Sequence, residues 1–289
     1  MTTETSTSTG RVPLQRPYRP PRKRGTTSIW RRGLSGRATF VIGVASSATL
    51  VAVWHLLSAT ALVSPLLLPP PLRVAETFWQ FLTAEYLGET LVGHTAASMT
   101  IVAGGWLLGG LVGLPLGILI GWSDRVRWLV FPLFQLLRPV PPLAWIPLAI
   151  VWLGIGDPAR IFVVFLSAVV PWTINSMAAV SSVDPLLIRA ARTLGAGDGS
   201  ILRRVVIHTA TPTLVAGARI ALGNAWTTLI AAELLAASAG LGFVALNASQ
   251  TLSSDILLVS MGIIGVLGAL FSAILRGVGR AVAPWAKEA

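Results

Sequence analysis

Few residues in this chain have side chains and surroundings that suggest chemistry. Glu233 lies in the apolar segment TTLIAAELLAASAGLG, and Asn224 and Arg219 precede it on the same predicted helix. A charged side chain at the centre of a bilayer costs roughly 2.5 to 3.5 kcal/mol on insertion scales, so a carboxylate kept there points to function. We expect Glu233 to be a pathway or gate residue; the alternative is an interfacial carboxylate or one paired with Arg160.

The motifs of common catalytic sites are missing. The sequence has no GxxxxGK[ST], HExxH or GxSxG pattern, and no pair of carboxylates clusters in an apolar run. Zero cysteines exclude disulfides, thiolate metal sites and cysteine nucleophiles. The GAGDG run at 195–199 follows a predicted helix and not a strand, which is typical of a helix stop. We therefore expect no catalytic residue, no metal site and no cofactor, and energy for any uphill transport would have to come from a partner chain or an ion gradient.

The composition indicates a protein that lives in a membrane. Hydrophobic residues make up 54% of the chain and charged residues 11%, against about 25% charged in soluble proteins. Runs of roughly 20 apolar residues are long enough to cross a bilayer. Six such runs occur, at about 38–62, 92–121, 128–153, 159–180, 213–236 and 256–275. The predicted fold class is therefore an all-α polytopic membrane protein with about six transmembrane helices.

The net charge of +11 follows this topology. If the N-terminus is cytoplasmic, the basic residues gather in cytoplasmic segments and only Arg73 and Arg160 lie outside, as the positive-inside rule requires. The charge therefore reports topology, and we expect no nucleic-acid partner. The expected domains are a disordered basic cytoplasmic tail at 1–37, a transmembrane domain at 38–280 with a cytoplasmic loop at 184–212, and a cytoplasmic tail at 281–289.

Two features of the spans concern packing. Glycines recur at every fourth residue from Gly105 to Gly121, which leaves one helix face open to a close neighbour. The third span is interrupted by RPVPP at 138–142, where carbonyls lose their intrahelical donors. Such backbone is tolerated at membrane depth only where protein or a water-filled cavity covers it. The residues that we predict to line a translocation pathway are Glu233, Asn224, Trp226, Pro141 and Pro142.

A polar, basic insert separates the fourth and fifth apolar runs. Asp184 suits an N-cap, Pro185 the first helical turn and Gly195 the left-handed position after a helix. The pattern predicts about three turns of amphipathic surface helix with a cap at each end. A membrane protein that builds such a helix has a partner to dock on it.

From about Ser64 to Leu246 the chain resembles permeases of the nitrate, sulfonate and taurine group of ABC importers, most closely the taurine branch. The matching stretches are SPLLLPPP (64–71), LRPVPPLAWIPLAIVWLGIGD (137–157), IRAARTLGAGD (188–198) and TTLIAAELLAASAGLGF (227–243). The resemblance implies a type I importer permease fold in the bacterial inner membrane, with the N-terminus cytoplasmic. It also implies the partners: a second permease copy, two copies of an ABC ATPase subunit and an extracytoplasmic solute-binding protein.

The same resemblance implies that the insert is the loop that couples the permease to its ATPase. The residues that it assigns to coupling are Arg189, Ala190, Ala191, Arg192, Leu194, Gly195 and Asp198. Two positions depart from the general loop pattern, with Arg189 where glutamate is usual and His208 where proline is usual. Arginine at the first position is also familiar from the taurine branch. We expect His208 to lengthen the loop's second helix, because histidine keeps an N–H that proline lacks.

The implied function is inward translocation, by alternating access, of a small organic or inorganic anion such as taurine or an alkanesulfonate. The alternative is an ion-coupled secondary transporter that acts without an ATPase. Such a transporter would show inverted repeats and several intramembrane acids. No repeat of 20 to 50 residues stands out, and Glu233 is thin support alone. A membrane scaffold without transport would not require the broken third span.

Overall fold

The computed structural model describes residues 36–60 and 63–285. The chain divides into two units, residues 1–50 and 51–289. Helix α1 (Gly36–Ala59) begins in the first, and its apolar stretch Phe40–Ala59 of 20 residues is long enough to cross a bilayer. Most of the predicted basic tail, residues 61–62 of the predicted first span and residues 286–289 of the predicted C-terminal tail lie outside the described residues.

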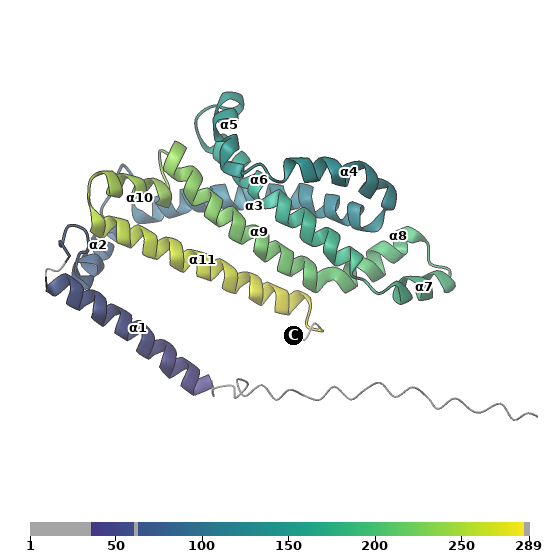
Figure 1. Cartoon of the computed structure of the whole chain (residues 1–289), viewed down its shortest axis with the longest axis horizontal. Coiled ribbons are helices and arrows are strands. Elements are labelled where there is room, and N and C mark those ends of the chain that lie inside the picture. The colour runs from purple at the N-terminus through teal and green to yellow at the C-terminus, as the bar shows by residue number, and fades with distance from the viewer. Residues whose placement is uncertain (1–35, 61–62, 286–289) are drawn as a thin grey trace, which may run out of the picture. The chain divides into compact units, whose positions relative to one another are not determined.

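The second unit is built from helices. In chain order these are α2 (Pro71–Thr83), α3 (Leu91–Trp122), α4 (Asp124–Leu137), α5 (Ile146–Leu153), α6 (Asp157–Ser181), α7 (Pro185–Thr193), α8 (Asp198–Ile201), α9 (Ile207–Ala236), α10 (Leu241–Gln250) and α11 (Ser254–Val282). Helix α3 packs on α6, α6 on α9 and α9 on α11. Figure 1 shows α10 at one end of this bundle and α7 with α8 at the other.

The predicted spans are confirmed as apolar helices. Within the described residues, five continuous helices are long and apolar enough to cross a membrane, and α4 with residues 142–153 forms a sixth, bent pair. The fifth span is longer than predicted, because α8 continues through a π-helical turn (Leu202–Val206) into α9. The second half of the predicted 184–212 loop is thus helical, and His208 lies inside α9.

The break in the third span has the predicted cause. Pro141 and Pro142 cannot donate a backbone N–H, so α4 cannot continue past them. The chain instead makes a 3₁₀ turn (Pro142–Trp145) and re-enters a helix at α5, at an angle of 81° to α4. The break leaves room beside α6 and α9, where the cavity described below is found.

The glycine stripe of α3 faces α6, as its spacing predicts. A Cβ atom on Gly109 would lie 2.7 Å from the Cβ of Ala168, and one on Gly113 would lie 2.7 Å from the carbonyl oxygen of Val169. Both distances are shorter than contact between non-bonded atoms allows, so only glycine permits this approach of α3 and α6. The close packing fixes α6, which carries one wall of the cavity.

Candidate functional site

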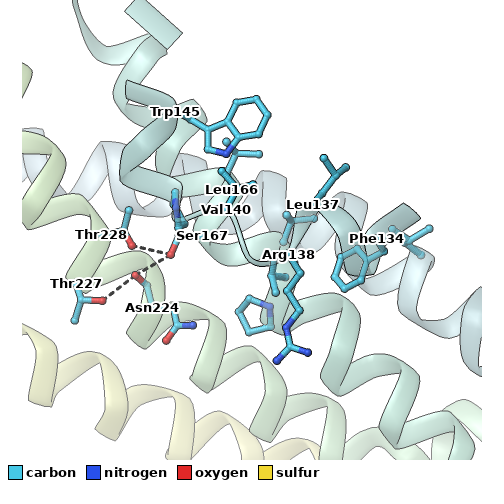
Figure 2. Close-up of a pocket in the computed structure, with 15 residues that line it drawn as sticks. Phe134, Leu137, Arg138, Val140, Trp145, Leu166, Ser167, Asn224, Thr227 and Thr228 are labelled. Carbon is cyan, nitrogen blue, oxygen red and sulfur yellow. Dashed lines mark hydrogen bonds between the residues drawn. The ribbon is translucent and has the colours of Figure 1, made fainter. Parts of the chain in front are cut away.

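A cavity of about 470 Å³ lies beside the break in the third span. This volume falls in the range of about 300–1,000 Å³ that is usual for small-molecule sites. Figure 2 shows its walls, which come from the end of α4 and the turn after it, from α6 and from α9, with one residue of α3. The residues that line it are Leu116, Phe134, Leu137, Arg138, Val140, Pro142, Trp145, Leu166, Ser167, Val169, Val170, Pro171, Asn224, Thr227 and Thr228.

Hydroxyl groups join α6 to α9 along one wall of the cavity. The Ser167 hydroxyl donates to the backbone carbonyl of Asn224 (3.1 Å), and its oxygen lies 2.7 Å from the Thr228 hydroxyl, which therefore donates to it. Thr227 donates back to the carbonyls of Gly223 and Asn224 at 3.2 and 3.0 Å. All three hydroxyl hydrogens are thus used within the protein. The bonds hold α6 and α9 in fixed register at the cavity.

The structure separates the residues predicted for the pathway. Asn224 and Pro142 line the cavity, and Pro141 precedes the turn that forms its rim. Trp226 lies on another face of α9, where it is buried and packs edge-on against Phe271 of α11 with ring centroids 5.2 Å apart. Glu233 lies two turns further along α9, away from this lining.

Several residues that line the cavity were not predicted to do so from the sequence. Ser167, Thr227 and Thr228 were not singled out, and from the sequence we expected Arg138 to extend toward the cytoplasmic interface rather than to contact a ligand. A hydroxyl in an apolar span often bonds back to its own helix, as Thr227 does, so its presence alone is a weak signal. The one available signal was the spacing of Asn224 and Thr228, four residues apart on one helix face.

Glu233 belongs to a buried hydrogen-bonded cluster at the start of α10. Its side chain has 0% exposure, and it accepts from the Ser98 hydroxyl (2.6 Å) and from the backbone N–H of Gly242 (2.8 Å). The N–H of Leu241 donates to the Ser98 oxygen at 3.0 Å. A carboxylate at a helix N-terminus is stabilised by the unpaired N–H groups and the helix dipole.

His94 completes the hydrogen-bonded cluster at the start of α10. Its Nδ1 accepts from the Gly240 N–H at 3.2 Å, so Nε2 carries the proton and donates to the carbonyl of Tyr86 at 2.7 Å. Gly240 has φ of +128°, and a side chain there would meet the Glu233 carboxylate. His94, Ser98 and Glu233 thus satisfy the N–H groups of Gly240, which precedes α10, and of the first two residues of α10, and the geometry supports an anchoring role for Glu233.

No ion pair joins Glu233 to Arg160 in the part of the chain that the structure describes. Arg160 is buried, pairs with Asp157 at the start of its own helix, and donates to the carbonyl of Ala239 at 3.1 Å. The arginine therefore fixes the loop between α9 and α10 from one side, and the Glu233 cluster fixes it from the other.

The predicted surface helix is α7, and both of its caps form. The Asp184 carboxylate accepts from the N–H of Leu186 at 2.8 Å. Gly195 has φ of +80°; its N–H donates to the Arg192 carbonyl (2.9 Å), and the N–H of Ala196 donates to the Ala191 carbonyl (3.1 Å). These paired bonds are the Schellman arrangement, which needs a left-handed residue at this position.

Helix α7 and the turn that follows it present most of the predicted coupling residues to the outside. Ile188 and Ala191 pack on the bundle, whereas Leu186 and Leu194 are 68% and 87% exposed. Arg192 pairs with Asp198 at 3.0 Å, which ties the end of α7 to the start of α8. The predicted residues that are exposed are Arg189, Ala190, Arg192, Leu194, Gly195 and Asp198, and Ala191 is half-buried. The result is a short helix, capped at both ends, with exposed apolar and basic side chains.

Residues 113–288 match the family described as "Binding-protein-dependent transport system inner membrane component". The taurine transport system permease protein TauC of Escherichia coli (strain K12) is 38% identical over 260 residues, which cover 90% of this chain and 94% of that protein. The bicarbonate transport system permease protein CmpB of Synechococcus elongatus is 35% identical over 255 residues, covering 86% and 91%. The putative aliphatic sulfonates transport permease protein SsuC of Bacillus subtilis is 32% identical over 243 residues, covering 84% and 87%.

Among solved structures, the MetNI methionine ABC transporter has a similar chain. It matches with a TM-score of 0.60 at 22% identity, over 66% of this chain and 95% of that one. The likeness confirms the predicted type I permease fold, and the family match confirms a multi-pass inner membrane transport subunit, which is not an enzyme. The chain belongs to the family of inner membrane components of binding-protein-dependent transport systems, as a permease subunit of an ABC importer.

Proposed function

We propose that this chain is the membrane-spanning subunit of an ATP-driven importer for taurine or a related alkanesulfonate. The observation that carries the proposal is 38% identity to a taurine permease over 90% of this chain and 94% of that one. The assembly that we propose has two copies of this chain, two ATPase subunits and an extracytoplasmic solute-binding protein. The N-terminus and the α7 end of the bundle would face the cytoplasm, where basic residues gather.

The outward face of α7 is the proposed docking surface for the ATPase. Exposed Leu186 and Leu194 provide apolar contacts, and Arg189 and Arg192 provide positive charge at the rim. Both caps and the Arg192–Asp198 pair make α7 rigid, so a movement of the ATPase would be passed on to the start of α9.

The cavity beside the broken third span is the proposed section of the translocation pathway in this chain. Alternating access would expose it in turn to the two sides of the membrane as ATPase closure moves α7 and the helices attached to it. The break at Pro141 and Pro142 supports this proposal, because exposed carbonyls at membrane depth require a protein or water environment.

The test is reconstitution in liposomes with and without partners. We expect the purified chain to hydrolyse no ATP alone, to co-purify with an ATP-binding subunit, and to take up taurine only with that subunit, ATP and a solute-binding protein. Uptake by the chain alone, driven by an ion gradient, would overturn the proposal in favour of a secondary transporter.

A further inference from the structure

Three side chains that line the cavity, those of Arg138, Asn224 and Trp145, carry hydrogen-bond donors that no other described residue uses. The Arg138 guanidinium makes no hydrogen bond or ion pair with residues 36–60 or 63–285, and neither does the side-chain amide of Asn224. Figure 2 shows both groups extending toward the same side of the cavity, away from Trp145. The hydroxyls of Ser167 and Thr228 are engaged with each other and with the backbone. On the side of the cavity away from Trp145, the free donors therefore come from Arg138 and Asn224.

The charge of the cavity is of one sign. Arg138 is the one charged residue among the fifteen described residues that line it, and no aspartate or glutamate is among them. A guanidinium keeps its charge at any physiological pH and presents paired N–H groups that match the oxygens of an anionic head group. The remainder of the lining is mainly aliphatic and aromatic, with Leu166, Val140 and Trp145 among the residues that Figure 2 shows.

We propose that Arg138 and Asn224 form a transit site for the oxyanion head group of an organic solute, whose short apolar tail packs against the Trp145 side. This inference rests on the proposed function and deepens it. With no carboxylate among its described lining residues, the site has no anionic group to pair with an ammonium group. It therefore accepts ethanesulfonate and taurine alike, and discrimination between them is left to the solute-binding protein.

The absence of cysteine from the chain allows a direct test, because one introduced thiol is the only site of labelling. Val140→Cys places the thiol in the cavity lining, at a position with 40% exposure. The full-length protein in lipid nanodiscs is labelled with two methanethiosulfonates, one carrying an anionic sulfonatoethyl group and one a cationic trimethylammonioethyl group. The readout is the ratio of the two modification rates, with and without Arg138→Gln.

We expect Arg138→Gln to lower the anionic-to-cationic rate ratio at Val140→Cys by about tenfold, because it removes the one charged side chain of the described lining, two residues from the thiol. Arg138→Lys should keep most of the preference. Arg219→Gln is the matched control, since Arg219 is an exposed arginine of α9 that lines a separate small pocket beside Trp226 and Phe271. It should change the ratio by less than about twofold.

A second thiol tests whether the effect is local to the cavity. Val266→Cys lies on α11, is 68% exposed and lines a different, apolar groove. Its rate ratio should not respond to Arg138→Gln. An unchanged ratio at Val140→Cys, or an equal change at Val266→Cys or with Arg219→Gln, would overturn the transit site.

Uptake separates this inference from the proposed function. In the reconstituted complex, Arg138→Gln should lower taurine and ethanesulfonate uptake by a similar factor, about tenfold, while ATP hydrolysis stays stimulated by the loaded solute-binding protein. If the wild-type complex carries no sulfonate but the labelling preference is found, the proposed substrate is wrong and the anion site stands. If uptake of sulfonates is normal in Arg138→Gln, the site is wrong and the proposed function stands.

Discussion

Glu233→Ala tests whether Glu233 anchors α10. The substitution removes both carboxylate oxygens, so the N–H of Gly242 and the Ser98 hydroxyl lose partners that now lie 2.8 and 2.6 Å away. Both groups are buried, and water has no ready access to replace the lost acceptor. The first turn of α10 should therefore open far more often than in the wild-type protein.

The size of the effect follows from these contacts. A buried donor left without a partner costs about 1–3 kcal/mol, which corresponds to roughly a 5- to 150-fold rise in local opening. Glu233→Gln should cost less, because its amide oxygen can still accept from Gly242. Its NH₂ group would face the Ser98 oxygen, which already accepts from the Leu241 N–H, so the Ser98 hydrogen loses its acceptor.

Hydrogen–deuterium exchange of peptides covering Gly240 to Gly242 measures this opening directly. We expect the order of exchange rates to be Glu233→Ala, then Glu233→Gln, then wild type. Glu85→Ala is the control, since the exposed Glu85 carboxylate makes no side-chain hydrogen bond within the described residues. Unchanged protection in Glu233→Ala would refute the anchoring role, and the same protection with lost uptake would restore the gate interpretation.

Two further substitutions test packing and coupling. Gly109→Ala should lower the stability of the purified protein, measured by thermal unfolding, by about 1–3 kcal/mol, because the added Cβ would lie 2.7 Å from that of Ala168. Gly104→Ala is the control and should be nearly neutral, because its Cβ would lie an ordinary 3.6 Å from Ile161. Equal effects of the two substitutions would argue against the close contact of α3 and α6. Gly195→Val should fray the end of α7 at a cost on the order of 1 kcal/mol, because the φ of +80° at this position suits glycine. It should also lower uptake and make ATP hydrolysis independent of the loaded binding protein, whereas the control Gly199→Val, in open space with an ordinary φ, should do neither. Wild-type uptake with normally stimulated hydrolysis in Gly195→Val would mean that α7 does not transmit the ATPase movement.

The sequence by itself determined the features that depend on neighbouring residues along the chain. A span is set by the length of an apolar run, a break by consecutive prolines, and a cap by Asp184 before a helix and Gly195 after it. In each case the cause is the need to satisfy backbone N–H and C=O groups, which is decided within one or two helical turns. The glycine stripe of α3 belongs to the same class, since its four-residue period fixes one face of a helix.

The tertiary structure alone decided which polar groups meet and which helix faces border the cavity. Asn224 and Trp226 are two residues apart on α9, yet one lines the cavity and the other packs on α11. Glu233 meets Ser98, 135 residues away in the chain, and Ser167 meets Thr228, 61 residues away. Nothing local favours these partners, because a buried polar group is satisfied by whichever donor the packed helices bring within reach, and that depends on the register of α3, α6 and α9.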